Sequence, residues 1–400
     1  MHTQVDLLVI GGGIIGLSIA RELIMRHPTA KIMVLEKEAD VAYHGSGRNS
    51  GVLHAGFYYT ADSLKAKFTR DGNQELREYC YANNLRISEN KKVVVAQNEK
   101  ELPALFELDK RGKTNGVSVK IIDEKELHDI DPNVKTFQHA LYSPKTATVD
   151  PVEVTQAIKK ELQDKGVEIR FSEPYKARLD GNTIETAGKN RYSAKVIINA
   201  AGLYADKIAR DFGYSDKYTI IPFKGLYLKY KGNNPPVSIN VYPVPNLRNP
   251  FLGVHFTVTV DGTVKIGPTS VPAFWRENYS GFDRFNAGET LQVLGWETVL
   301  FATNAFGFRR LAFEEMKKYN KKYFTNLAKG LVREMDVKGF SVWGQPGIRA
   351  QLLNKKTREL VMDFVVEGDN DTVHVLNAVS PAFTCAFPFS KWVVDHYVKY

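Results

Sequence analysis

The stretch "VDLLVIGGGIIGLSIARELI", residues 5–24, decides the fold that we predict for this chain of 400 residues. It opens with a short apolar run typical of a strand, passes through a G-x-G-x-x-G pattern, and ends with apolar residues at helical spacing. A second apolar run, "KIMVLEK" at residues 31–37, reads as another strand and carries the acidic Glu36 near its end. This order of strand, glycine turn, helix, strand and acid predicts a dinucleotide-binding βαβ unit.

The three glycines of the pattern have separate roles in such a unit. Gly11 permits the tight turn, Gly13 lets the backbone approach a pyrophosphate, and Gly16 lets the helix pack closely on the strand. The helix N-terminus offers N–H groups and positive potential to the phosphates, and Glu36 can accept hydrogen bonds from ribose hydroxyls. The alternative is a buried βαβ unit that holds no ligand.

The continuation of the chain favours FAD over a nicotinamide cofactor. A loop of Gly, Ser and Asn, "HGSGRNSG" at residues 44–51, stands where a nicotinamide dehydrogenase usually continues with βαβ units. A later strand, turn and helix, "KVIINAAGLYADKIA" at residues 195–209, reads as a return to the same domain. In "NAVSPAFTCAF" (residues 377–387), Ser380 and Pro381 fit the N-cap and first residue of the last helix, either facing the flavin or as a plain cap. The residues that we expect at the cofactor are Gly11, Gly13, Gly16, Glu36, Lys37, Ser46, Asn49, Ser50, Ala200, Gly202, Asp206, Ser380, Pro381 and Ala382.

These elements predict an α/β fold, α+β overall, in which a Rossmann-type FAD-binding domain carries an inserted substrate domain built on an antiparallel sheet. A hairpin is expected in "FLGVHFTVTVDGTVKIG" (residues 251–267) around Asp261-Gly262. The expected boundaries are 1–82, 149–215 and 340–400 for the FAD domain, and 83–148 and 216–339 for the substrate domain. Catalysis is expected where the two domains face each other.

Composition limits the remaining classes of protein. The net charge of +9 fits a solvated basic surface, an anionic substrate, a membrane surface or nucleic acid, and charge alone does not separate them. Two cysteines cannot make a disulfide framework and fit a reducing compartment. No Cys or His spacing suggests a metal, and no RNA-binding module is recognisable. The apolar run from Val5 to Ala20 is short for a membrane span and lacks the basic flank of a signal peptide.

Two histidines are candidates for a catalytic base. His54 lies in "RNSGVLHAGFYY" (residues 48–59), where it is either a base beside the flavin, a substrate-orienting group, or a core histidine bonded to a backbone carbonyl. Tyr58 and Tyr59 either donate hydroxyls to a substrate or serve in packing. His255 shares a face of the predicted hairpin with small and polar residues, and that face lines a cavity or meets water.

Cationic groups are candidates for binding an anionic substrate. Arg349, in "WGQPGIRAQL" (residues 343–352), can hold a carboxylate with two parallel hydrogen bonds or lie on the surface. Lys224 is a weaker candidate for a second cation. The mixed lysines and aromatics of "FEEMKKYNKKYF" (residues 313–324) fit a solvated helix face or an interfacial helix on an anionic membrane.

Several of these stretches together carry a resemblance to a known family. The chain resembles the D-amino-acid oxidase superfamily and, within it, the L-2-hydroxyglutarate dehydrogenase/oxidase family. The matching stretches are "GRNSGVLHAGFYY", "SLKAKF", "NVYPVPN", "PFLGVHFT", "KIGPTS", "PGIRAQ" and "HVLNAVSPA". Where the family pattern reads "NAPSPAAT", this chain has "NAVSPAFT", which places Phe383 near the expected site.

The resemblance implies oxidation of L-2-hydroxyglutarate to 2-oxoglutarate with non-covalent FAD, and electron transfer to a quinone or oxygen. It implies that Arg349, in a G-x-R segment, binds the substrate carboxylate, and it adds Tyr242 of "NVYPVPN" to the candidate substrate residues. A small dicarboxylate is the expected partner, with no metal and no nucleic acid. The expected location is cytoplasmic, with peripheral contact to the inner face of the cell membrane. The alternatives are an amino-acid or amine oxidase of the same superfamily and a flavin-holding adaptor for membrane or RNA.

Overall fold

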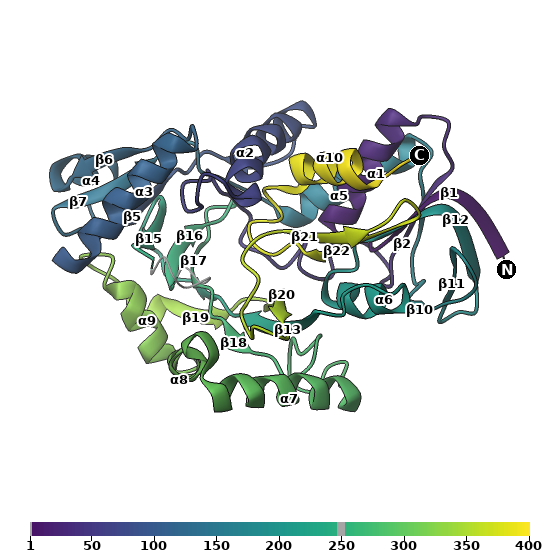
Figure 1. The fold of residues 1–400 in the computed structure, drawn as a ribbon. Helices are drawn as coiled ribbons and strands as arrows, with labels where there is room; N and C mark the ends of the chain where they lie inside the picture. Colours follow the sequence, from purple (N-terminus) through teal and green to yellow (C-terminus); the bar gives the residue numbers. More distant parts are fainter. Residues whose placement is uncertain (1, 246–252) are drawn as a thin grey trace. The chain divides into compact units, whose positions relative to one another are not determined.

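The computed structural model describes residues 2–245 and 253–400, which form two compact units (Figure 1). The first unit consists of Met1–Asn49, Pro151–Pro222 and Ile348–Tyr400. The second consists of Ser50–Asp150 and Phe223–Gly347. Each unit therefore gathers segments that lie far apart in the sequence, as expected for one domain that interrupts another.

The first unit is built on a parallel sheet with the strand order β22–β12–β1–β2–β9. Its central strand β1 is apolar and buried over its last four residues, as strands covered on both faces usually are. Antiparallel strands β11, β10 and β21 extend the sheet, and β13, which crosses into the second unit after Pro222, pairs with β20. The strands are β1 (His2–Ile10), β2 (Ile32–Leu35), β9 (Glu168–Arg170), β10 (Tyr175–Arg178), β11 (Thr183–Thr186), β12 (Arg191–Asn199), β13 (Tyr218–Gly225), β20 (Gly347–Asn354), β21 (Val365–Gly368) and β22 (Thr372–Asn377).

Helix α1 of the first unit packs against α5 and α10, and α6 packs against β22 and β10. The helices are α1 (Ile14–Arg26), α5 (Pro151–Asp164), α6 (Ala205–Asp211) and α10 (Ala386–Tyr397). The strand, glycine turn and helix predicted at the N-terminus are thus present as β1 and α1, and the α/β fold class is confirmed.

The predicted start of the last helix is wrong. Helix α10 begins at Ala386, whereas Ser380 and Pro381 lie in turns before it. The reason is Pro388, which lies in the first turn of α10, where the helix needs no N–H donor. A helix that began at Pro381 would carry Pro388 in its interior, at a cost of about 3 kcal/mol.

The second unit is built on an eight-stranded sheet in the order β19–β14–β17–β16–β15–β5–β7–β6. Its pairs are antiparallel, as predicted, except that β15 runs parallel to β5. These two strands come from different segments of the unit, and a parallel pair needs such a long connection. The strands of the sheet are β5 (Lys92–Val95), β6 (Lys120–Asp123), β7 (His139–Ser143), β14 (Leu228–Tyr230), β15 (Asn240–Pro243), β16 (His255–Val258), β17 (Val264–Gly267) and β19 (Phe340–Trp343).

The hairpin predicted around Asp261-Gly262 is present as β16 and β17. Phe251 and Leu252 of the predicted hairpin lie outside the described residues. The helices of this unit are α2 (Leu64–Ala82), α3 (Leu102–Thr114), α4 (Glu124–Ile130), α7 (Ala287–Thr303), α8 (Phe308–Lys317) and α9 (Lys321–Lys329). Short strands β3 (Val52–Leu53), β4 (Ile87–Ser88), β8 (Ala147–Val149) and β18 (Val271–Pro272) complete it.

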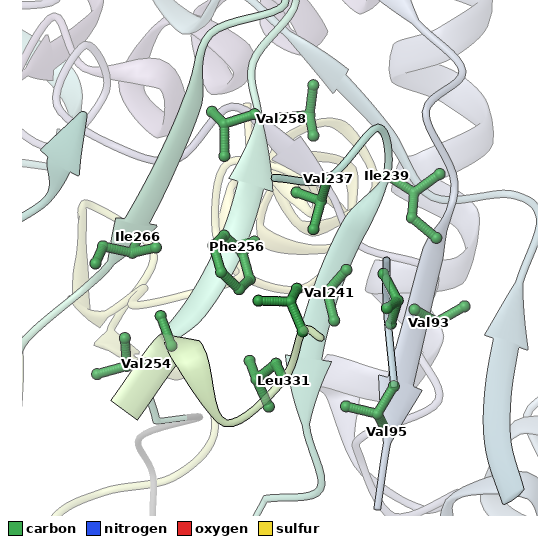
Figure 2. Packing of buried hydrophobic residues seen from close by; sticks show 14 of the residues in the cluster. Val93, Val95, Val237, Ile239, Val241, Val254, Phe256, Val258, Ile266 and Leu331 are labelled. Carbon is green, nitrogen blue, oxygen red and sulfur yellow. The ribbon is translucent and has the colours of Figure 1, made fainter. Parts of the chain in front are cut away.

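Both faces of the second unit's sheet are buried. Because successive residues of a strand point to opposite faces, Val93, Val241 and Phe256 lie on one face, in the apolar cluster shown in Figure 2. Val94 and Tyr242 lie on the other face, in a second cluster with residues of α3 and of the segment after β3. The sheet therefore separates two cores, and a polar side chain on either face is withdrawn from water.

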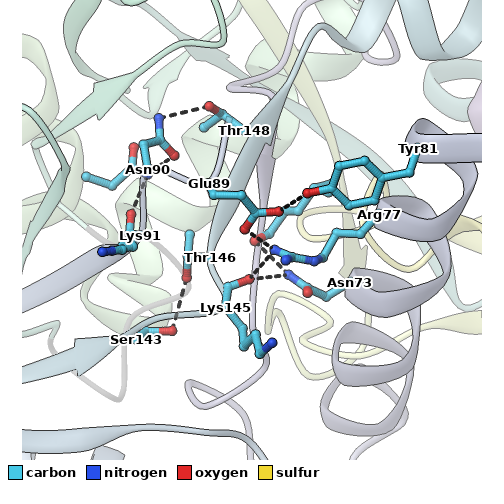
Figure 3. Close-up of polar contacts among 12 residues, drawn as sticks. Asn73, Arg77, Tyr81, Glu89, Asn90, Lys91, Ser143, Lys145, Thr146 and Thr148 are labelled. Atoms are coloured by element: carbon cyan, nitrogen blue, oxygen red, sulfur yellow. Dashed lines mark hydrogen bonds and ion pairs between the residues drawn. The ribbon is translucent and has the colours of Figure 1, made fainter. Parts of the chain in front are cut away.

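Residues 50–82 belong to the second unit, whereas the predicted boundary placed them in the FAD domain. The Asn73 side chain of α2 donates hydrogen bonds to the carbonyl oxygens of Leu53 (3.0 Å) and Lys145 (3.2 Å). Arg77 forms an ion pair with Glu89 at 2.6 Å (Figure 3). The contacts with Lys145 and Glu89 tie α2 to segments of the second unit that lie further along the chain.

No helix within residues 2–245 and 253–400 has both the length and the hydrophobicity that crossing a bilayer requires. Cys80 and Cys385 are both buried.

Candidate active site

The glycine turn between β1 and α1 leaves no room for side chains at Gly11 and Gly16. Gly11 has a φ of +114°, and a Cβ there would lie 2.5 Å from the carbonyl oxygen of Ala200. A Cβ at Gly16 would lie 1.9 Å from the carbonyl oxygen of Gly11, and one at Gly13 would lie 3.2 Å from Ser46 Oγ. Only glycine satisfies the first two positions, so the turn stays tight and α1 starts close to β1.

Polar groups gather around this turn. Glu36, buried after β2, accepts hydrogen bonds from the backbone N–H of Gly12 (2.8 Å, Oε2) and of Glu38 (2.9 Å, Oε1). Burial raises the pKa of Glu36, although these backbone hydrogen bonds oppose the rise. Gly13 has no side chain with which to cap α1, and Ser46 Oγ accepts a hydrogen bond from the N–H of Ile14 (2.8 Å) instead. Backbone donors, a hydroxyl and an acid thus meet at one helix N-terminus, which fits the phosphates and ribose of a dinucleotide.

Other predicted cofactor residues surround or follow this turn. Lys37 Nζ donates to Glu38 (2.9 Å), and Asn49 Nδ2 donates to the carbonyl oxygen of Ser46 (2.8 Å). Ala200 and Gly202 follow β12, which pairs with β1, whereas Ser50 begins the second unit. The turn that holds Ser380, Pro381 and Ala382 precedes α10 in the first unit.

Asp206 has structural partners that account for its burial. Its Oδ2 accepts hydrogen bonds from Arg210 and from the backbone N–H of Ile220, both at 3.2 Å. The carboxylate thereby joins α6 to β13, and these contacts explain the residue without a cofactor.

The second unit brings both candidate histidines onto one face of its sheet. His255 of β16 stacks on the ring of Tyr242, with 3.6 Å between the ring centroids. Lys92 Nζ lies 4.1 Å from the centroid of the Tyr242 ring and 3.4 Å from Nδ1 of His54. The ring centroid of Tyr58 lies 5.4 Å from the same Nζ. The segment after β3 and three sheet strands therefore build one buried cluster of titratable groups.

Burial sets the protonation of this cluster. The pKa of His54 lies well below its ordinary value because the ring is buried, and the charges of Lys92 and His255 lower it further. Burial also lowers the pKa of Lys92, to about 7, and raises the pKa values of Tyr58 and Tyr242. His54 is thus a neutral imidazole at physiological pH, which is the form that can accept a proton.

His255 has a defined orientation. Its Nδ1 lies 2.9 Å from the carbonyl oxygen of Gly253, an acceptor, so Nδ1 carries the proton and donates. In this tautomer the lone pair of the His255 ring lies on Nε2. Both histidines consequently remain candidates for the base. The face of β16 that carries His255 does not meet water, because His255 and Thr257 are both buried.

The sequence patterns did not identify Lys92 as a candidate site residue. The stretch "KKVVVAQ" reads as a strand with a charged end, and two adjacent lysines suggest solvent. The available signal was the alternation of the strand, which places Lys92 on the same face as Val94. The segment that covers this face comes from residues 54–59, far from β5 in the sequence.

The remaining predicted residues lie elsewhere. Arg349 lies in β20 of the first unit and is half-buried. Lys224, buried in the second unit, donates from Nζ to Asn278 Oδ1 (3.1 Å), and burial lowers its pKa. Tyr59 is half-buried, and its backbone carbonyl accepts a hydrogen bond from the Asn115 side chain. The cluster around the Lys92 amine therefore contains four of the predicted residues: His54, His255, Tyr58 and Tyr242. Tyr59 and Lys224 are not part of it.

Comparison with known proteins identifies relatives along the whole chain. The family described as FAD dependent oxidoreductase (DAO) matches residues 6–396. The L-2-hydroxyglutarate dehydrogenase of Escherichia coli (strain K12) is 34% identical over 395 residues, covering 98% of this chain and 92% of that protein. The mitochondrial L-2-hydroxyglutarate dehydrogenase of Nematostella vectensis is 35% identical over 419 residues, covering 98% and 90%.

Solved structures share the fold. The L-alpha-glycerophosphate oxidase of Mycoplasma pneumoniae with FAD bound superposes with a TM-score of 0.77 at 22% identity, covering 100% of this chain and 97% of that one. The glycine oxidase of Geobacillus kaustophilus gives a TM-score of 0.68 at 16% identity, covering 98% and 94%.

Gly11→Ala is expected to weaken the affinity for FAD by at least about tenfold. A non-glycine residue at this φ costs roughly 1–2 kcal/mol, and about 1.4 kcal/mol corresponds to a factor of ten. The Cβ would also press on Ala200. Titration of the apoprotein with FAD measures the affinity, and circular dichroism shows whether the variant folds. Gly45→Ala is the matched control, since a Cβ there meets nothing within 4 Å. Wild-type affinity in a folded Gly11→Ala protein would contradict the assignment of the turn.

Proposed function

We propose that this chain, which belongs to the FAD-dependent oxidoreductase family and to the L-2-hydroxyglutarate dehydrogenases within it, oxidises L-2-hydroxyglutarate to 2-oxoglutarate. The observation that carries the proposal is the match to dehydrogenases of that name along 98% of the chain. The first unit is proposed as the FAD-binding domain and the second as the substrate-binding domain. The glycine turn, Ser46 and Glu36 would hold the dinucleotide.

Oxidation of a secondary alcohol to a ketone removes the hydroxyl proton and the hydrogen on the same carbon with two electrons. FAD, when bound, supplies an acceptor for that hydrogen as a hydride. The chain must supply a base for the proton, and a buried neutral imidazole suits this role. We assign the role to His54 or His255, with Tyr58 and Tyr242 shaping the surroundings of the substrate.

Arg349 is proposed to bind a carboxylate of the substrate. Its planar guanidinium can donate two parallel hydrogen bonds to one carboxylate, which fixes the orientation as well as the position of the substrate. Two carboxylates on the substrate also suit the net charge of +9. Lys224 is proposed as a second cation: within residues 2–245 and 253–400 its amine is paired with the neutral Asn278 side chain and with no carboxylate, which leaves it able to bind an anion.

The second candidate function is an amino-acid or amine oxidase. The fold that this chain shares with the glycine oxidase of Geobacillus kaustophilus favours that candidate. An amine substrate can lose its hydride from a carbon next to neutral nitrogen and depends less on a histidine base. The buried neutral imidazole of His54 favours the hydroxy acid.

Anaerobic addition of L-2-hydroxyglutarate to the purified protein is expected to bleach the flavin absorbance. The D-enantiomer, malate, lactate and glycine should bleach it much more slowly, because two carboxylates and one configuration at C2 must match the site. Rapid bleaching by glycine or another amino acid, with none by L-2-hydroxyglutarate, would establish the oxidase alternative.

Arg349→Ala is expected to lower kcat/KM by roughly tenfold to a hundredfold. A charge-assisted hydrogen bond contributes about 1.5–3 kcal/mol. Steady-state kinetics with L-2-hydroxyglutarate measure the effect, and the ratio of flavin to protein should stay unchanged. Lys356→Ala, an exposed change in the turn after β20, is the control. An unchanged kcat/KM in Arg349→Ala would remove this residue from the substrate site.

We further propose peripheral contact with an anionic bilayer and a membrane quinone as the electron acceptor. The lysines of residues 313–324 support this less than predicted, because Lys318 is buried and paired with Glu315, and Lys317 is paired with Glu314. Stronger support comes from apolar side chains nearby. Phe282 before α7 is 83% exposed, and Leu291 of α7 is 75% exposed. Such large apolar side chains in water are typical of a surface that contacts a partner or a lipid.

Replacement of Phe282 and Leu291 together by serine is expected to reduce sedimentation with anionic liposomes several-fold. Each apolar side chain that enters a lipid interface contributes about 1.5–3 kcal/mol when fully buried, and added salt should weaken the remaining attraction. Phe106→Ser, at an exposed position of α3, is the control. Stopped-flow reoxidation should be faster with a short-chain quinone than with oxygen. Liposome binding that is absent, or equal in all variants, would contradict the proposed membrane contact.

A further inference from the structure

Lys92 occupies a position in which lysine is rarely found. It lies in β5, with β15 on one side and β7 on the other, and its side chain is fully buried. The residues directly opposite it are Asn240 and Ser143, neither of which is charged. Within the part of the chain that the structure describes, no carboxylate forms an ion pair with Lys92, and burial alone lowers its pKa to about 7.

The contacts of the amine are one imidazole nitrogen and three aromatic rings. Nζ lies 3.4 Å from Nδ1 of His54, within reach of a long hydrogen bond. The ring centroids of Tyr242, Tyr58 and Phe57 lie 4.1, 5.4 and 5.8 Å away. Lys92 therefore has one directional hydrogen-bond partner among these groups, and that partner is a candidate base.

Two effects on the charge of Lys92 oppose each other. Aromatic ring faces favour the ammonium by about 0.5–2 kcal/mol. Burial without a carboxylate disfavours it and is the larger effect, since the pKa falls to about 7 from the ordinary 10.5. Neutral amine and ammonium are consequently both populated near neutral pH.

We propose that Lys92 is a positioning residue that selects the tautomer of His54, an inference that rests on His54 as the base of the proposed function. A neutral amine can accept a hydrogen bond from Nδ1–H of His54, which leaves a lone pair on Nε2 for the hydroxyl proton of the substrate. An ammonium can only donate. It makes Nδ1 the acceptor and places the ring proton of His54 on Nε2, where no proton can then be taken up.

Burial shifts the pKa values of three groups around Lys92 away from neutrality. Tyr58, from the segment after β3, and Tyr242 of β15 face the amine, and burial raises the pKa of both. His255 of β16 lies behind the Tyr242 ring. His54 itself has a pKa well below its ordinary value. A change near pH 7 in the tautomer of His54 thus reports on Lys92 and not on protonation of the imidazole.

The inference predicts a pH dependence with a defined sign. Flavin reduction by L-2-hydroxyglutarate should accelerate as the pH rises through about 7, because Lys92 then loses its proton. Lys92→Met can neither donate nor accept, so this step of the profile should disappear. Lys92→Arg keeps a donor at every pH and should slow reduction by on the order of 100-fold, since a base in the wrong tautomer loses its contribution.

Nitrogen NMR of the FAD-loaded protein with isotope-labelled histidine tests the tautomer without turnover. His54→Gln assigns the signal of His54. In the wild type, the protonated ring nitrogen should be Nδ1 above pH 7 and Nε2 below it, and Lys92→Arg should show the Nε2–H form throughout. Lys265→Met is the control. Lys265 is also a buried lysine of this sheet with a pKa lowered to about 8, but its Nζ donates to the carbonyl oxygen of Ser50.

A tautomer of His54 that is constant on both sides of pH 7 in the wild type overturns the inference, and this measurement needs no variant that folds differently. A wild-type pH profile of flavin reduction in Lys92→Met overturns it as well. If L-2-hydroxyglutarate does not reduce the wild-type flavin at any pH, the proposed function fails, whereas the NMR titration still decides whether Lys92 controls His54.

Discussion

The first unit depends on the close contact between the start of α1 and the glycine turn that precedes it. A Cβ at Gly16 would lie 1.9 Å from the carbonyl oxygen of Gly11, so the helix can start at Ile14 only because both positions lack side chains. From this start α1 packs on α5 and α10, and β1 pairs with β2 and β12. The same geometry points backbone N–H groups toward Ser46 and Glu36. One steric constraint therefore determines both the core of the unit and the place where a dinucleotide fits.

The second unit depends on a sheet that is covered on both faces. Successive residues of its strands enter different cores, with Val93 and Phe256 in one and Val94 and Tyr242 in the other. A polar side chain on such a strand must find its partners within the core. Lys92 Nζ lies 3.4 Å from His54 Nδ1 and 4.1 Å from the centroid of the Tyr242 ring, so the amine meets an imidazole and an aromatic ring in this core. The electrostatic properties of the candidate site thus follow from its position inside a core.

The features that the sequence predicted well are those that a local pattern of residues determines. Glycine spacing and the acid at position 36 were sufficient for the βαβ unit, and the predicted FAD family is confirmed by the match over residues 6–396. Features that depend on distant segments were missed. Lys92 resembles a charged strand end until residues 54–59 cover it, and residues 50–82 join the second unit through contacts with Lys145 and Glu89. Pro388 indicates where α10 starts, but the prediction placed the start at Ser380-Pro381, which resemble an N-cap and first helical residue more strongly.

The burial of Lys92 also links folding to proton release. Between pH 7 and 10.5 the unfolded chain binds a proton at this lysine that the folded chain does not, so the free energy of unfolding rises with pH across this window. Below about 7 both states carry the proton, and the second unit must keep an ammonium in its core. With respect to this one residue, folding is therefore least favourable under mildly acidic conditions. A buried lysine that lowers the free energy of unfolding in this way indicates a position where function, and not stability, requires the residue.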